Sequence, residues 1–153
     1  MNRIDAIRSI LAKHKDSFFI FSNGLTSREA SFYCGHEGSF YMLHAMGEAL
    51  SVGMGLVSAN ANLNVVVIDG DGNALMGASS WVMNKYPNLH HYVLENKTYE
   101  TTGGQSLPEI IAWPEWCNRI PIDNADSHAT PNPPYPDEIW NGVDAWLKKQ
   151  KGD

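Results

Sequence analysis

The chain contains the stretch Val65-Val66-Val67-Ile68-Asp69-Gly70-Asp71-Gly72-Asn73, in which an apolar run ends abruptly in Gly-Asp-Gly. Four consecutive apolar, mostly β-branched residues are typical of a strand buried on both faces. The two glycines allow a sharp turn and a close approach of the backbone to a ligand. Asp71 is therefore predicted at the carboxyl end of a strand, where open α/β sheets bind their ligands.

A second apolar run, Tyr92-Val93-Leu94, ends at Glu95-Asn96. If it forms a neighbouring parallel strand, Asn96 lies at the same sheet edge as Asp71. One carboxylate, one amide oxygen and a free backbone carbonyl suit Mg²⁺, which keeps other positions for phosphate oxygens and water. Two plainer interpretations stay open: an aspartate in a glycine turn, and an asparagine that bonds to its own backbone.

The rest of the chain alternates between the two kinds of secondary structure. Strands are predicted at 18–21, 40–43, 65–68 and 90–94, and helices at 4–15, from Thr26 or Ser27 to Phe32, at 45–59 and at 74–85. This alternation predicts an α/β fold with a parallel sheet and right-handed crossovers. Thr26 or Ser27 is expected to cap its helix. Gly47, Gly53 and Gly55 lower helix propensity, so we expect another backbone to pack closely there.

Length and composition predict one globular domain over residues 1–153. The chain is 43% hydrophobic and 18% charged, with a net charge of −6, which argues against a general nucleic-acid surface. No apolar run is long enough to span a bilayer, and no signal-peptide core is evident. Cys34 and Cys117 are too few and too far apart for a disulfide framework or a zinc motif. We expect a cytoplasmic protein without a membrane partner.

Three ordered blocks resemble those of thiamine diphosphate-dependent 2-oxo acid decarboxylases, in particular the phosphonopyruvate and sulfopyruvate decarboxylases. They are Ser22-Asn23-Gly24-Leu25-Thr26-Ser27-Arg28-Glu29, the run from Phe40 to Leu56, and Glu95-Asn96-Lys97-Thr98-Tyr99-Glu100-Thr101-Thr102-Gly103-Gly104-Gln105. Gly70-Asp71-Gly72 followed by Asn96 resembles the cofactor signature of the same enzymes. The resemblance implies the three-layer, open parallel sheet of the thiamine diphosphate-binding fold, shortened at its C-terminus.

The resemblance also implies the site. Thiamine diphosphate and Mg²⁺ are the expected cofactors, with the metal held by Asp71, Asn96 and the backbone carbonyl of Thr98. The diphosphate is expected against the turn and the start of the next helix, where backbone N–H groups bind anions. That turn comprises Gly70, Gly72, Asn73 and Ala74.

Two further residues match positions that act on the cofactor. Met46 matches the bulky residue that holds the cofactor in its bent form, and core packing is its plainer interpretation. The position of His44 gives a backbone carbonyl to the cofactor's amino group. Relatives usually carry glycine there and histidine at the position of Tyr99, so this chain departs from the family at both. His44 is either a substrate contact or a partly buried loop histidine.

The expected reaction is decarboxylation of a small anionic 2-oxo acid, in which the cofactor supplies the chemistry. It needs a glutamate beside the aminopyrimidine, normally carried by a pyrimidine-binding domain. Glu37, Glu48 and Glu95 do not match that glutamate. We therefore expect this chain to be the diphosphate-binding subunit of a hetero-oligomer, with the activating glutamate on a separate pyrimidine-binding subunit.

The last third of the sequence departs from the family. Residues 107–137 are rich in Pro, Asn and Asp and are predicted to form an irregular loop or arm, with only 119–122 suited to a strand. Residues 138–149 are predicted to form an amphipathic C-terminal helix. An exposed apolar patch is expected to mark a subunit interface. Its predicted members are Met42, Met46, Val52, Met54, Leu56, Trp113 and Trp116.

Two functions from other classes stay open. The run from Val66 to Asn73 also fits the motif of haloacid-dehalogenase-like phosphatases, in which Asp69 is the nucleophile and Asp71 the acid. That motif should open the domain, whereas a strand and a helix precede it here. The second is a non-catalytic binding or assembly protein on the same fold, which the shortened C-terminus and the departures at His44 and Tyr99 favour.

Overall fold

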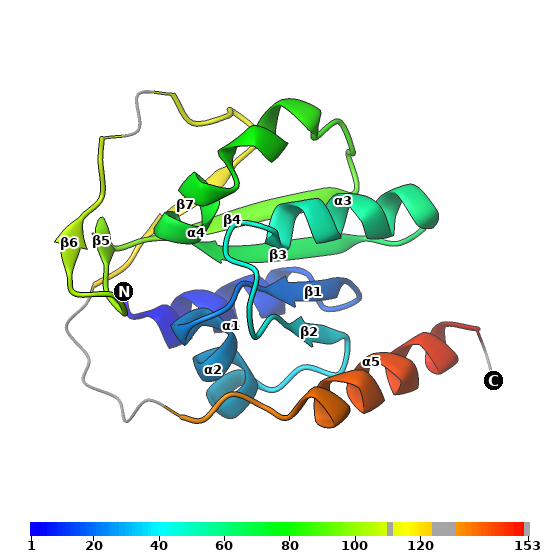
Figure 1. Cartoon of the computed structure of the whole chain (residues 1–153). Helices are drawn as coiled ribbons and strands as arrows, with labels where there is room; N and C mark the ends of the chain where they lie inside the picture. The colour runs from blue at the N-terminus through cyan, green and yellow to red at the C-terminus, as the bar shows by residue number, and fades with distance from the viewer. Residues whose placement is uncertain (110–111, 124–130, 152–153) are drawn as a thin grey trace.

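A five-stranded parallel sheet in the order β2-β1-β3-β4-β7 forms the centre of the molecule (Figure 1). The computed structural model describes residues 1–109, 112–123 and 131–151. The sheet strands are β1 (Phe18–Phe21), β2 (Ser39–Tyr41), β3 (Val65–Gly70), β4 (Leu89–Glu95) and β7 (Asn118–Pro121). A short antiparallel pair, β5 (Thr98–Tyr99) and β6 (Gln105–Ser106), lies outside this sheet.

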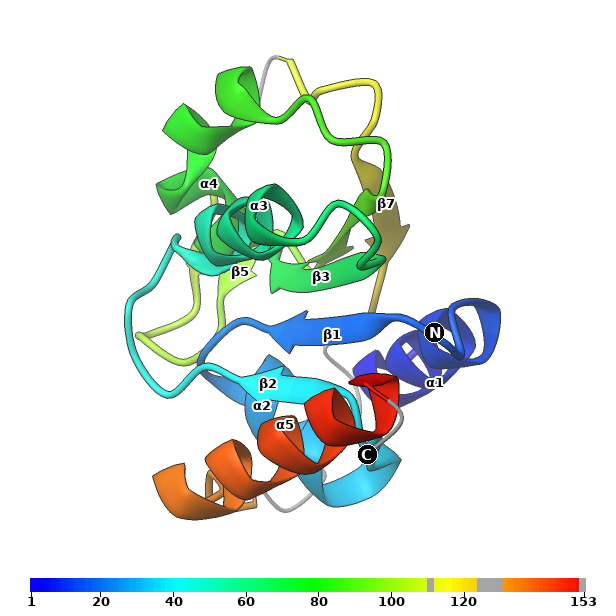
Figure 2. The same cartoon turned by 90° about the vertical axis from the view of Figure 1, so that its right-hand side faces the viewer.

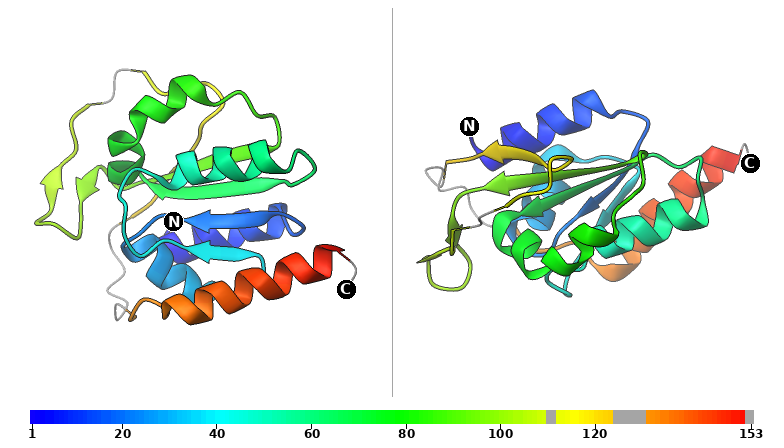
Figure 3. Two further views of the ribbon diagram at one scale, coloured as in Figure 1. Left: turned by 45° about the vertical axis from the view of Figure 1, so that its right-hand side comes forward. Right: turned by 90° about the horizontal axis from the view of Figure 1, so that it is seen from above.

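Helices cover both faces of the sheet and make three layers (Figure 3). They are α1 (Arg3–Lys13), α2 (Leu25–Glu29), α3 (Ala49–Ala59), α4 (Asp71–Met76) and α5 (Pro136–Lys151), with the π-helical segment η1 (Ala30–Cys34) and the 3-10 helix η2 (Ala78–Met83). The predicted α/β fold with a parallel sheet is confirmed.

The alternation of side chains along each strand divides the core between the two faces. Val66 and Ile68 of β3 pack with α1 and η1, while Val65 and Val67 pack with α3. Trp146 of α5 joins the α3 side, and α5 lies along β2 at the edge of the sheet (Figure 2). β3 is buried from Val65 to Asp69, as expected for a central parallel strand.

The parallel register brings the ends of the strands together at one edge. Val65 pairs with Leu89 and Gly70 with Leu94, so β3 and β4 end side by side. The residues after these strands, Asp71 and Asn96, consequently leave the sheet at the same edge. This is the arrangement expected from the sequence.

The helix predicted at 45–59 begins only at Ala49. Ala45 and Gly47 have φ values of 62° and 86°, in the left-handed region that interrupts a right-handed helix. Of the three glycines, only Gly47 meets another backbone, that of Gly77. Gly53 lies instead against the side chains of Val67 and Leu89, and Gly55 has open space around its Cα. The prediction of close backbone packing is therefore correct for Gly47 alone.

Two other helix predictions are wrong in detail. The helix predicted at 74–85 begins at Asp71 and ends at Met76, and η2 follows after Gly77. α2 begins at Leu25, after Gly24, without a side-chain cap. The hydroxyl of Ser27 donates instead to the carbonyls of Phe21 and Ser22, which ties α2 to the end of β1.

The one stretch of 107–137 that the sequence suits to a strand, 119–122, is a strand in the structure, shifted by one residue to Asn118–Pro121. β7 pairs with β4 from Tyr92↔Asn118 to Glu95↔Pro121 and forms the last strand of the sheet. Residues 110–111 and 124–130 of the segment lie outside the described residues. The C-terminal helix begins at Pro136 rather than at 138. Within the described part of the chain, no helix is long and apolar enough to cross a membrane.

Candidate functional site

Asp71 is the first residue of α4, so β3 delivers its carboxylate directly to the sheet edge. One carboxylate oxygen accepts from the N–H of Gly72 at 2.9 Å and the other from the N–H of Lys97 at 2.7 Å. Burial raises the pKa of the Asp71 carboxyl, and these backbone donors offset that shift only in part. A buried carboxylate among neutral donors is costly, so this position favours a cation nearby.

Lys97 adopts a backbone conformation that is rare for a residue with a side chain. Its φ is 61°, in the left-handed region, which costs about 1 kcal/mol or more for a residue other than glycine. This conformation directs its N–H to the carboxylate of Asp71. The Lys97 side chain is exposed. The strained backbone of Lys97 thus helps to hold the carboxylate of Asp71 in place.

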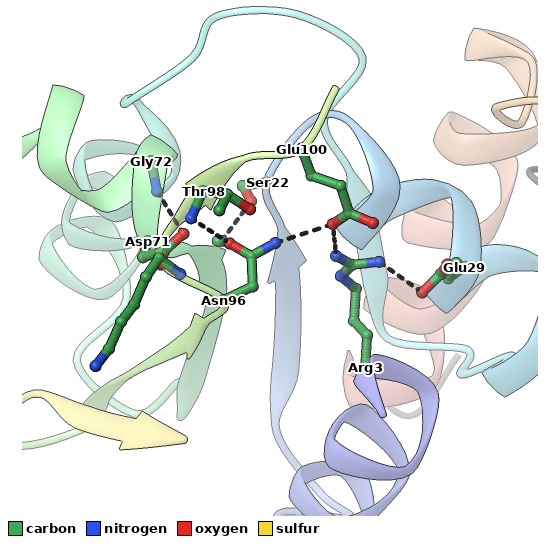
Figure 4. A network of polar contacts seen from close by, with 10 residues as sticks. Arg3, Ser22, Glu29, Asp71, Gly72, Asn96, Thr98 and Glu100 are labelled. Carbon is green, nitrogen blue, oxygen red and sulfur yellow. Dashed lines mark hydrogen bonds and ion pairs between the residues drawn. The ribbon is translucent and has the colours of Figure 1, made fainter. Parts of the chain in front are cut away.

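Asn96 follows β4 and belongs to a chain of polar contacts (Figure 4). Its amide oxygen accepts from the N–H of Thr98 at 3.0 Å, and its amide nitrogen donates to the carboxylate of Glu100 at 2.9 Å. The guanidinium of Arg3 forms ion pairs with Glu100 and with Glu29. These contacts connect the loop after β4 to α1 and α2.

A glycine and an asparagine amide determine how the turn after β3 packs against its neighbours. A Cβ at Gly72 would lie 3.0 Å from the ring of Tyr99, so only glycine fits there without a shift. The amide oxygen of Asn73 accepts from the N–H of Gly47 at 3.1 Å. Asn73 therefore fastens the segment before α3 to the start of α4.

The residues predicted to bind the cofactor gather along one cleft, with two exceptions. Met46, Gly70, Asp71, Gly72, Asn73, Asn96 and Thr98 all line it. Ala74 does not: it is buried beneath the turn, only 2% exposed. His44 is exposed and lines an adjoining cavity.

The same cleft contains polar residues that the sequence patterns did not single out: Arg3, Asn23 and Glu100. The amide oxygen of Asn23 is buried and has no hydrogen-bond partner among the described residues. Glu100 comes four residues after Asn96, which is a usable local signal. No local sequence signal predicts the role of Arg3, because Arg3 and its partner Glu100 are 97 residues apart in the sequence.

Asp69, the nucleophile in the phosphatase alternative, lies in the core. It is 2% exposed and bonds to the ring of His91 at 3.0 Å, while His91 is fully buried. The thiol of Cys117 lies 3.9 Å from the other ring nitrogen, and burial raises its pKa to about 12. A nucleophile must reach its substrate, so this geometry disfavours the phosphatase mechanism at Asp69.

The open parallel sheet, with a cleft at the carboxyl ends of its strands, has the arrangement in which α/β proteins bind their ligands. Residues 25–116 match the family model for the C-terminal TPP-binding domain of thiamine pyrophosphate enzymes. The chain belongs to this family of thiamine diphosphate-binding domains.

Relatives of established name agree with this assignment. The chain is 40% identical to the sulfopyruvate decarboxylase subunit beta of Methanocaldococcus jannaschii over 107 residues, 67% of this chain and 56% of that protein. It is also 40% identical to the phosphonopyruvate decarboxylase of Streptomyces viridochromogenes over 121 residues, 72% of this chain and 30% of that protein. A third relative is the sulfopyruvate decarboxylase subunit beta of Methanothermobacter thermautotrophicus, 38% identical over 69% of this chain and 58% of that protein. The matches span between about a third and somewhat over half of these relatives.

Proposed function

We propose that this chain is the diphosphate-binding subunit of a thiamine diphosphate- and Mg²⁺-dependent decarboxylase. Its substrate is a small anionic 2-oxo acid of the phosphonopyruvate or sulfopyruvate type. The observation that carries the proposal is the convergence of Asp71, Asn96 and Thr98 on one cleft at the carboxyl edge of a parallel sheet. The names of the relatives supply the reaction class.

The residues present fit a hard cation and a diphosphate. Asp71 offers a buried carboxylate that accepts hydrogen bonds from the backbone N–H groups of Gly72, Lys97 and Asn96, and its two oxygens have four lone pairs, which leaves room for a metal. Asn96 offers an amide oxygen and Thr98 a backbone carbonyl, and oxygen donors of this kind suit Mg²⁺. Asn23 also lines this cleft, and its buried amide oxygen, which has no hydrogen-bond partner within the described residues, is a further acceptor there.

In this proposal each residue has a defined task. Asp71, Asn96 and the carbonyl of Thr98 hold Mg²⁺, while Gly70, Gly72 and Asn73 line the turn that receives the diphosphate and the buried Ala74 supports that turn from below. Met46 is 39% exposed beside the cleft and is available to support the bent form of the cofactor. The carbonyl of His44 is proposed to accept from the cofactor's amino group. The bound cofactor supplies the electron sink for loss of CO₂.

The activating glutamate is proposed to come from a separate pyrimidine-binding subunit. Glu95 is held by Arg119 at 2.9 and 3.1 Å, and Glu37 pairs with Lys149 on the surface near α5. Glu48 precedes α3 and is exposed. None of the three lines the cleft that contains Asp71 and Asn96. A subunit beta among the relatives implies that such enzymes use a second chain.

Calorimetric titration of thiamine diphosphate, with and without Mg²⁺, tests the cofactor site. We expect binding only with Mg²⁺ or a similar cation, and a loss of about tenfold or more for Asp71→Ala and Asn96→Ala. Asp16→Ala removes an exposed carboxylate elsewhere and should leave binding unchanged. Equal affinity in all the variants would remove the metal site from the proposal.

Release of CO₂ from phosphonopyruvate, sulfopyruvate and pyruvate tests whether a separate pyrimidine-binding subunit is needed for activity. The pure chain with thiamine diphosphate and Mg²⁺ is expected to be nearly inactive, and a pyrimidine-binding partner is expected to restore turnover. A positioned acid–base group contributes roughly 10²–10⁴-fold in rate. Robust turnover by the chain alone would contradict the split between subunits. No turnover with any partner would favour a binding or assembly protein on this fold.

A further inference from the structure

A cavity of about 700 Å³ adjoins the cofactor cleft. The connection between β1 and α2 forms one wall, and the segment after β2 forms another. The two hollows share Asn23, Gly24, Leu25, Glu100 and Thr101. A small molecule in this cavity would therefore lie directly beside a cofactor in the cleft. Pro133, from the segment that precedes α5, closes part of the rim.

Arg28 of α2 lines this cavity, and its positive charge has no partner among the residues that the structure describes. The other three arginines of the chain are paired: Arg3 with Glu29 and Glu100, Arg8 with Asp5, and Arg119 with Glu95. Arg28 forms no ion pair or side-chain hydrogen bond with any residue that the structure describes, although it is half-buried. A half-buried guanidinium without an acceptor favours an anion from outside the chain.

The remaining charges of the cavity leave this preference intact. Glu100 is the carboxylate in the lining, and its charge is engaged by Arg3 and by the amide of Asn96. His44 lies in the lining as a second nitrogen donor. The cavity beside Lys97 differs, because Asp71, Glu95 and Glu109 line it too. Lys97 is thus poorly placed to attract an anion, whereas Arg28 is well placed.

We propose that Arg28, assisted by His44, binds the anionic group at the far end of the substrate, a phosphonate or a sulfonate. A guanidinium presents a planar fork of donors that matches tetrahedral oxyanions and carboxylates. The 2-oxo acid end of the same molecule would then face the shared wall and the cofactor cleft. This assignment rests on the proposed function, since it names the group that distinguishes this substrate class from pyruvate.

Titration of the full chain with phosphonoacetate, in the presence of Mg²⁺ and thiamine diphosphate, tests the assignment. Phosphonoacetate carries the distal anion but has no oxo group to react, and acetate lacks the distal anion. We expect Arg28→Gln to weaken phosphonoacetate about ten- to hundredfold and Arg28→Lys to retain part of the affinity. The weak binding of acetate should not change. Arg8→Gln removes a guanidinium outside the cavity and is the matched control.

Cofactor affinity and thermal unfolding measured on the same samples separate the possible results. Unchanged phosphonoacetate affinity in folded Arg28→Gln, or no binding by the wild-type chain, would overturn the role of Arg28 and leave the cofactor site standing. Failure of the wild-type chain to bind thiamine diphosphate would count against the proposed function. Arg28-dependent phosphonoacetate binding would even then support the anion site.

Discussion

The direction in which Asn96 presents its amide is set by a carboxylate four residues away and, through it, by an arginine that is distant in sequence. Its amide nitrogen is held by Glu100, which is itself held by Arg3 of α1. Because an amide can rotate to exchange its oxygen and nitrogen, the carboxylate of Glu100 fixes which atom is left for a metal. The oxygen, on the side of Thr98, is the atom that suits Mg²⁺.

Replacing Glu100 should therefore weaken the metal site without removing a ligand. We expect Glu100→Ala to lower the Mg²⁺-dependent affinity for thiamine diphosphate about two- to tenfold, the usual value of one hydrogen bond. Calorimetric titration measures this, with Glu115→Ala as a control that removes an exposed carboxylate elsewhere. Equal affinities for the two variants would show that Glu100 has no influence on Asn96.

A pair of histidines predicts how stability depends on pH. The rings of His14 and His90 lie 4.8 Å apart, and burial, followed by neighbouring charges, lowers both pKa values from 6.5. The unfolded chain thus binds more protons than the folded chain in this range. Stability from this source is present above pH 6.5 and is lost as the pH falls through the lowered values.

We expect the free energy of unfolding in urea to decrease between pH 7.5 and pH 5.5. His90→Asn removes one member of the pair and should make this decrease smaller. His36→Asn, which changes a histidine outside this pair, should keep the wild-type slope. An identical slope in all three proteins would place the pH dependence on other groups.

The strands were the elements that the sequence predicted best. Runs such as Phe18–Phe21 and Val65–Ile68 are apolar because both of their faces are buried, and that signal is local. Helix starts were predicted less well. α3 begins later than predicted because Ala45 and Gly47 have left-handed backbone conformations, and α4 begins earlier than predicted, at Asp71. β7 was predicted only as a possible strand at 119–122 and not as the last strand of the sheet, because a strand at the edge of a sheet is largely exposed and its polar sequence gives a weak signal.

Two glycines in or near helices should respond in opposite ways to alanine. A Cβ at Gly77 would overlap the carbonyl of Gly47, so Gly77→Ala forces the two backbones apart and should destabilise the fold by about 1–3 kcal/mol. Gly55 lies inside α3 with open space around it, and Gly55→Ala should stabilise by about 0.5–1 kcal/mol.

Urea unfolding of both variants measures this difference. The close approach of Gly47 and Gly77 also joins the segment that carries Met46 to the end of α4. We therefore expect Gly77→Ala to weaken cofactor binding as well, whereas Gly55→Ala should not. A neutral or stabilising Gly77→Ala would mean that the contact is easily relaxed.

The apolar surface predicted from the sequence is exposed only in part, and further exposed apolar residues lie on α4 and η2. Of the predicted residues, Met46 and Trp116 are exposed, at 39% and 37%. Met42 and Met54 are buried in the core, and Trp113 is half-buried. On α4 and η2, the side chains of Met76, Val82 and Met83 are 57%, 91% and 67% exposed. Together with Met46 they make up the apolar region around α4 and η2. Exposed apolar residues gathered in this way are typical of an interface.

We expect this region to contact the pyrimidine-binding partner. Val82→Ser combined with Met83→Gln should weaken the association about tenfold or more, because the complex then buries less apolar surface. Light scattering and co-elution measure the complex. Phe32→Ser changes a residue of similar exposure, 68%, on the α1 side of the sheet and should have no effect. A monomer at micromolar concentration with cofactor and partner present would contradict the interface.

The site was predictable from the sequence only where its residues follow strands. Asp71 and Asn96 could be placed at one edge because each directly follows an apolar run. The contact of Arg3 with Glu100, and the place of Arg28 in the adjoining cavity, join segments that no local pattern connects. Pairing of charges in particular depends on the assembled fold. Arg3 is paired with Glu29 and Glu100, whereas Arg28 has no charge partner in the described part of the chain, yet the two arginines look alike in the sequence.

The order of the strands also determines how the chain can acquire its structure. β1 is made first, yet it pairs on one side with β2 and on the other with β3, where Phe18 meets Val65. All the pairings within the sheet are parallel, and such contacts form only after long loops have closed. During synthesis on the ribosome, the apolar Phe18–Phe21 segment must therefore wait for β3 to emerge. Slow folding and a need for protection by chaperones are the expected consequences of this topology.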